Sequence, residues 1–139
     1  IVDRIASLEQ SKTLGVNAAL ARVQMAVDRV RAAEQTLSAA EAADRTAQRN
    51  LERQKRLLVE GLASQRAVEL AEMEEAHRRT DVDKARAALS AARNELLALK
   101  ADQGKVRTDI GASVESARAD RAKALEAVAH AEAELNRIE

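Results

Sequence analysis

Apolar positions in the first half of the chain repeat every seven residues, and no Gly or Pro interrupts the run from 16 to 60. One column of this repeat is large and apolar at all but one position: Val16, Val23, Val30, Leu37, Asp44, Leu51 and Leu58. A second column, three residues later, is alanine at all but its last position: Ala19, Ala26, Ala33, Ala40, Ala47 and Gln54. Two such columns, sustained over several heptads, form the seam of a coiled coil. The pattern predicts an ascending helix over 16–60 with a thin, alanine-rich seam.

The second half shows a similar seam from about residue 65 onwards. Its members again follow three- and four-residue spacing: Val82, Ala85, Leu89, Ala92, Leu96, Leu99, Val106 and Ile110. Glu75, Arg78 and Gln103 interrupt it, and the spacing resumes from Val114 to Ile138 with Arg121 as an exception. This pattern predicts a descending helix over 65–139.

Gly61 and Ser64 predict a turn over 61–64 between the two helices. Gly61 fits the left-handed position that ends a helix, and Ser64 fits an N-cap whose hydroxyl accepts from a backbone N–H of the next turn. A connection this short joins antiparallel neighbours. The predicted fold class is therefore all-α, a long antiparallel coiled-coil hairpin with two arms.

The remaining glycines predict interruptions in both arms. Gly15 and Gly111 are equally far in sequence from residue 63, so an antiparallel hairpin places them at one level. We expect a short basal helix over 1–14 and a break of the descending helix within 104–111. The alternative is a chance match, because Gly104 also offers a partner. Since the arms are unequal, the last dozen residues are expected to project beyond the first arm or to fray.

Composition excludes several classes of function. The 139 residues include no Cys and no aromatic side chain, and the formal net charge is zero. Without Cys there is no disulfide or thiolate site. Without aromatic side chains or a basic balance, nucleic-acid binding is not expected. No apolar run has the roughly 18 residues that a membrane span requires.

Candidate chemistry is sparse. His77 and His130 are far apart in sequence, and a zinc site would need further ligands on the same helix face. The acidic and basic residues from 72 to 79 are typical of a solvated helix face. A two-helix hairpin also encloses no cavity that could desolvate a catalytic group. We therefore expect no enzyme activity, no metal and no cofactor.

The residues next to the predicted turn are unusual. Leu57, Leu58, Val59 and Leu62 form a dense apolar group at the end of an otherwise alanine-rich rod. Gln54 makes the seam polar just before this group. An exposed apolar group needs cover. Either these four side chains pack on one another and close the hairpin, or a partner covers them.

The spacing of Arg53, Leu57 and Ser64 at this turn resembles the tip motif, R-x3-L-x6-S, of periplasmic adaptor subunits. These are the membrane fusion proteins of the HlyD/AcrA/MacA-like family. The stretch from Gly61 to Gln65 is also similar to the hairpin turn of that family. The resemblance covers the whole chain, which has the family's ascending helix, motif-bearing turn and descending helix.

The resemblance implies a function in a tripartite export system, for type I secretion or efflux. In the family, the hairpin spans the periplasm of a Gram-negative bacterium from domains near the inner membrane, and the subunits form hexamers. The hairpin tip meets a TolC-like outer-membrane channel. Residues that would make this contact are Arg53, Leu57 and Ser64, with Gly61, Leu62 and Gln65 shaping the turn. An inner-membrane transporter, of the ABC type, would bind through domains outside this chain. We accordingly expect the chain, which starts at Ile1, to be a fragment of an anchored parent.

The alternative hypothesis is a structural coiled coil, a dimerising rod or spacer without an export role. The seam of a straight rod would run through 58–66 without a turn. Gly61 and Ser64, with a new register after them, favour the hairpin instead.

Overall fold

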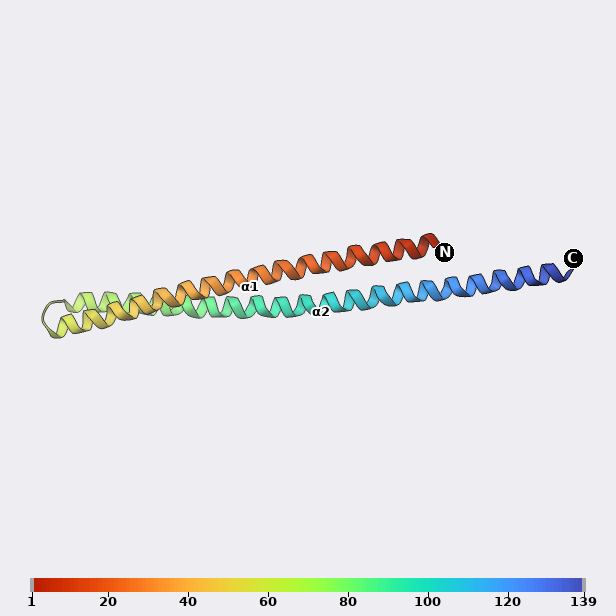
Figure 1. Cartoon of the computed structure of the whole chain (residues 1–139). Helices are drawn as coiled ribbons and strands as arrows, with labels where there is room; N and C mark the ends of the chain where they lie inside the picture. Colours follow the sequence, from red (N-terminus) through yellow and green to blue (C-terminus); the bar gives the residue numbers. More distant parts are fainter. Residues whose placement is uncertain (1, 139) are drawn as a thin grey trace. The chain divides into compact units, whose positions relative to one another are not determined.

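The computed structural model describes residues 2–138, which form two helices joined by a short turn (Figure 1). Helix α1 spans Val2–Val59 and helix α2 spans Gln65–Ile138. The helices pack against each other, and residues 2–138 contain no strand. The predicted all-α hairpin is therefore confirmed. The predicted helices over 1–14 and 65–139 include Ile1 and Glu139, which lie outside the described residues.

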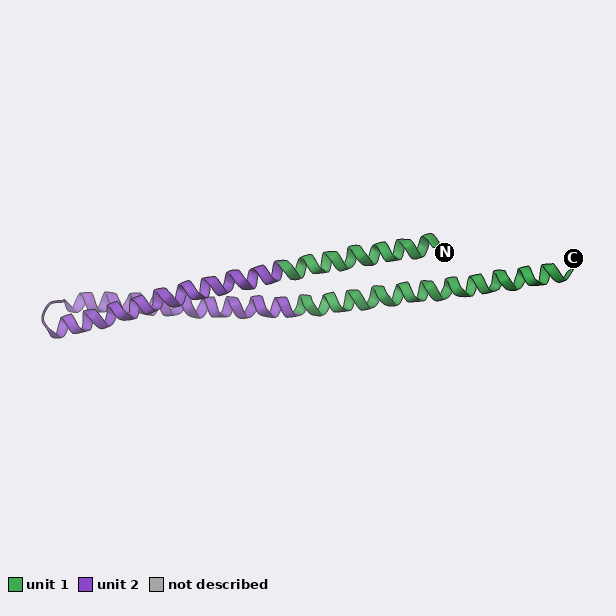
Figure 2. Ribbon diagram, viewed as in Figure 1, with its two compact units in different colours: residues 1–24, 98–139 green, residues 25–97 purple. Residues whose placement is uncertain are grey.

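The chain divides into two compact units, each built from one segment of each helix (Figure 2). The turn unit comprises Met25–Leu97 and contains the connection between the helices. The terminal unit comprises Ile1–Gln24 and Ala98–Glu139. Each unit has its own stretch of seam and is described by itself.

The seam of the turn unit follows the predicted heptad columns. On α1, every predicted seam position from Ala26 to Leu58 is buried or half-buried, while most positions between them are exposed. The buried apolar residues of this unit lie on the same columns: Ala26, Ala47, Val68, Ala71, Val82, Ala85 and Leu89. The predicted periodicity is confirmed, and small alanine side chains supply much of the contact.

Ion pairs across the seam give the register of the turn unit. Glu41 pairs with Arg86, Glu34 with Arg93, and Arg29 with Glu95. Within each pair, the two residue numbers sum to between 124 and 127. The helices therefore run antiparallel with their midpoint close to residue 63, as the sequence predicts.

The predicted interruptions at the glycines are wrong, because α1 continues through Gly15 and α2 continues through Gly104 and Gly111. A single Gly costs a helix interior only about 1 kcal/mol relative to Ala. Gly15 instead permits close packing in the terminal unit, since an added Cβ would lie 2.9 Å from Cδ1 of Ile110. Gly15 thus faces the residue before Gly111, so the predicted common level holds while the predicted break does not.

The end of α2 has no packing partner among the described residues. Every residue from 125 to 138 is exposed, although the segment stays helical to Ile138. The apolar positions that would continue the seam face solvent: Leu125, Val128, Leu135 and Ile138. The expected projection of the last dozen residues is confirmed, and they are helical rather than frayed.

Candidate docking site at the hairpin turn

The turn begins with a hydrogen-bonded helix end built around Gly61. The backbone N–H of Gly61 donates to the carbonyl of Leu58 (3.0 Å), and the N–H of Leu62 donates to that of Leu57 (2.7 Å). Gly61 has a φ of 75°, in the left-handed region. This pair of bonds with a left-handed residue is the Schellman ending of a helix. The predicted role of Gly61 is confirmed, with α1 ending at Val59.

Ser64 begins α2 as its N-cap. Its Oγ accepts a hydrogen bond from the backbone N–H of Ala67 (3.0 Å), and its carbonyl accepts one from Val68 (3.3 Å). The side-chain bond satisfies an amide that has no partner within the helix. The predicted cap is therefore confirmed. Ser64 stays exposed, so its hydroxyl proton remains available to an acceptor outside the turn.

The apolar group next to the turn is divided between the seam and solvent. Leu57 and Leu58 are half-buried, whereas Val59 is 89% exposed and Leu62 is 73% exposed. The hypothesis that all four side chains pack on one another is thus wrong for Val59 and Leu62. Two large apolar side chains are thus exposed within two residues of Gly61, where the chain reverses.

The motif residues lie on both sides of this turn. Arg53 is exposed on α1, and Leu57 follows four residues later, which places both on one side of the helix. Ser64 and Gln65 are exposed at the start of α2. Arg53 has no ion pair among residues 2–138, so its guanidinium is free to bind an acceptor.

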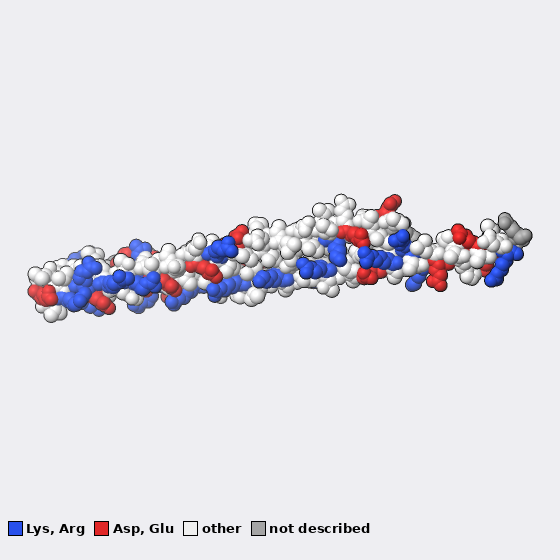
Figure 3. Space-filling view, in the orientation of Figure 1, with Lys and Arg blue, Asp and Glu red and all other residues white. Residues whose placement is uncertain are grey.

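A basic face of α1 was missed by the sequence interpretation. Arg45, Arg49 and Arg56 are exposed, and they lie on the same side of α1 as Arg53. In the space-filling view, basic side chains gather over the part of the turn unit near the turn (Figure 3). The signal was present in the sequence, because spacing of three and four residues aligns side chains on a helix.

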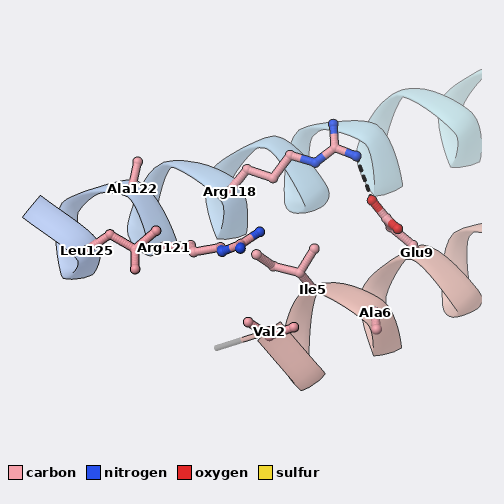
Figure 4. A pocket seen from close by; sticks show the side chains of 8 residues that line it. All are labelled: Val2, Ile5, Ala6, Glu9, Arg118, Arg121, Ala122 and Leu125. Carbon is pink, nitrogen blue, oxygen red and sulfur yellow. Dashed lines mark hydrogen bonds and ion pairs between the residues drawn. The ribbon is translucent and has the colours of Figure 1, made fainter.

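The hollows of the molecule are open grooves on the helix pair. One groove of about 490 Å³ in the terminal unit lies between Val2, Ile5 and Glu9 of α1 and Arg118, Arg121 and Leu125 of α2 (Figure 4). There Arg118 donates a 2.5 Å hydrogen bond to Glu9. That bond and the charge of Glu9 raise the pKa of Arg118, so its guanidinium stays protonated at neutral pH. At this groove, an exposed ion pair joins α1 and α2.

The histidines are exposed, and each lies near one carboxylate. His77 is 3.8 Å from Asp81, and His130 is 3.7 Å from Glu134, in both cases one turn along the same helix. Within residues 2–138, no three His, Cys, Asp or Glu side chains come together in a way that could hold a metal ion. The histidines therefore lie on solvated helix faces, as the sequence predicts.

No family model matches the chain, and comparisons with curated proteins and with solved structures found no match. Neither described helix contains a stretch long and apolar enough to cross a membrane.

Proposed function

We propose that this chain is the α-helical hairpin of a periplasmic adaptor subunit in a tripartite export system. In this proposal the parent protein is anchored at the inner membrane of a Gram-negative bacterium and serves an ABC-type transporter through other domains. Its hairpins assemble as a hexamer and meet a TolC-like outer-membrane channel tip to tip. The chain itself has no enzymatic role, and the exposed side chains at the turn make the contact.

The observation that carries the proposal is the solvent exposure of Val59 and Leu62 between Arg53 and Ser64. In a hairpin that served only as a spacer, apolar side chains so exposed at these positions would contribute little to stability. Here an apolar surface is flanked by an unpaired guanidinium and a small hydroxyl. Such a set suits a protein contact, because apolar atoms supply the burial and the polar groups fix the orientation.

The test is binding of the chain to the TolC-like channel of its source organism. The chain is tethered at high density, because many tips on one surface raise the effective concentration. We expect Arg53→Asp, Leu57→Asp and Ser64→Asp each to remove binding. Ser64→Asp is informative because Asp is also an N-cap residue and keeps the turn folded.

Matched controls use the same substitutions away from the turn. Arg31 is exposed and unpaired on α1, and Leu97 is exposed on α2, so Arg31→Asp and Leu97→Asp should bind like the wild type. Binding that survives the three tip substitutions would place the contact elsewhere. A wild-type chain that does not bind even when tethered would leave the spacer without an export role as the function.

A further inference from the structure

The seam of the turn unit is polar over one stretch near the turn. Five polar or charged side chains are buried or half-buried in or beside the seam there: Asp44, Asn50, Gln54, Glu75 and Arg78. Extending the register of the inter-helix ion pairs towards the turn sets 44–54 of α1 level with 73–83 of α2. These two stretches together are the polar segment.

The charged groups of α2 in the polar segment pair along their own helix rather than with α1. Glu75 is only 6% exposed, and its carboxylate accepts a hydrogen bond from Arg79 one turn away. Arg78 donates to Glu74 (2.7 Å) and lies 3.6 Å from Asp81. These pairs are made within α2 alone, so they remain when α1 and α2 move apart.

Asp44 likewise has no bond to the other helix. Gln48 of α1 donates to Oδ2 of Asp44 (3.1 Å), and the buried Oδ1 accepts no hydrogen bond from the described residues. The inter-helix ion pairs of the turn unit begin farther from the turn, with Glu41 and Arg86. Among residues 2–138, no ion pair or side-chain hydrogen bond crosses the seam within the polar segment.

Separation of the helices therefore costs less free energy in the polar segment than elsewhere along the seam of the turn unit. An apolar seam resists separation because its side chains become exposed to water. Carboxylate and amide groups instead gain hydration when they leave a buried position. The polar segment loses the apolar contacts of Ala47, Leu51 and Val82, of which Leu51 is only half-buried.

The seam is apolar again on both sides of the polar segment. Towards the turn, four apolar side chains are buried or half-buried: Leu57, Leu58, Val68 and Ala71. The hydrogen bonds around Gly61 and Ser64 close the hairpin beyond them. Farther from the turn, Ala85 and Leu89 are buried. Separation in the polar segment is therefore bounded at both ends.

We propose that the polar segment is a compliant joint, in which α1 and α2 part and close reversibly while the turn stays folded. Parting changes the orientation of the turn relative to the seam from Ala85 onwards. The exposed Val59 and Leu62 move with the turn, so they can meet a partner surface at more than one angle. The inference goes beyond the proposed function, and it does not require that the partner is a channel.

The test is the distance between two spin labels, measured by double electron–electron resonance. The chain contains no Cys, so each pair of labels is introduced by two substitutions. Arg49→Cys and Ala76→Cys place labels at exposed positions of the polar segment. Ser38→Cys and Ala87→Cys form a reference pair, also exposed, where the seam is apolar. We expect the distance distribution of the first pair to be at least about twofold wider than that of the reference pair.

Replacing the polar seam residues tests the cause of the separation. In a leucine background with Asp44→Leu, Gln54→Leu and Glu75→Leu, the first pair should give a distribution as narrow as that of the reference pair. The matched control makes the same three exchanges at exposed positions elsewhere: Gln10→Leu, Asp102→Leu and Glu126→Leu. This control should keep the wide distribution. Circular dichroism verifies that all variants remain helical.

Hydrogen exchange of the chain without labels gives an independent readout. Backbone amides of 46–52 should exchange at least about tenfold faster than those of 32–38, and the leucine background should slow them.

Several results would overturn the proposal. These are distributions of equal width for the two label pairs in the wild-type background, a wide distribution that persists in the leucine background, and a control that narrows as much as the leucine background. None of these readouts involves the channel. Failure of the joint and failure of the proposed function are therefore distinguishable.

Discussion

Gly61 determines how α1 ends, and its conformation makes a testable difference at the scale of one residue. An added Cβ at Gly61 would meet no atom within 4 Å, so a substitution there causes no clash. Its φ of 75° nevertheless costs an L-residue about 1–2 kcal/mol, and more for a β-branched one. We expect Gly61→Val to lower the free energy of unfolding by at least about 1 kcal/mol, measured by urea titration. Gly61→Asn should cost less, because Asn tolerates this region; equal stability of Gly61→Val and the wild type would contradict the left-handed turn.

Ser64 has a structural role that must be separated from docking. Removing its cap in Ser64→Ala should lower the free energy of unfolding by about 1 kcal/mol, whereas Ser64→Asp should change it little. Denaturation of the three proteins, followed by circular dichroism, measures both effects. If Ser64→Asp is as unstable as Ser64→Ala, loss of binding in Ser64→Asp cannot be assigned to the channel contact.

Asp44 is the one polar member of the large apolar column of α1. Gln48 donates to its Oδ2 (3.1 Å), but its buried Oδ1 accepts no hydrogen bond from the described residues. An unsatisfied buried polar atom costs about 1–3 kcal/mol. We expect Asp44→Leu to raise the melting temperature, while Asp102→Leu at an exposed position leaves it nearly unchanged. A lower melting temperature in Asp44→Leu would mean that the carboxylate has a partner.

At the scale of the helices, the sequence predicts most of the structure because the physics is local. Heptad spacing identified the seam, and the turn residues identified the ends of α1 and α2. The predicted breaks at the glycines are wrong, since a glycine can also permit close packing within a continuous helix. Packing of Ile110 against Gly15 comes from the opposite arm and cannot be seen in either helix alone.

The seam of the turn unit also contains polar residues, and helix propensity alone does not show that they are buried or half-buried. Glu75 is only 6% exposed and is paired with Arg79 on its own helix, and Gln54 is half-buried on α1. An apolar residue in the place of Glu75 would avoid the cost of burying a charge. The sequence showed Glu75 and Gln54 as interruptions, but burial shows that the seam passes through them. The sequence interpretation also missed the exposed face of arginines on α1. A solvated helix face has the same residue pattern whether or not a partner binds it.

At the scale of the whole molecule, pairing between helices decides which segments are stable. The end of a helix without a packing partner is marginal in water, because each added residue gains little free energy by propagation alone and the end frays. Residues 125–138 are in this situation, whereas Val82, Ala85 and Leu89 lie in a buried seam. We expect backbone amides of 125–138 to exchange with solvent at least about tenfold faster than those of 82–89, measured by hydrogen exchange with mass spectrometry. Equal protection of the two segments would mean that something covers Leu125, Val128 and Leu135 in solution. Dilution would then show whether the cover is a second copy, because protection that depends on concentration requires association.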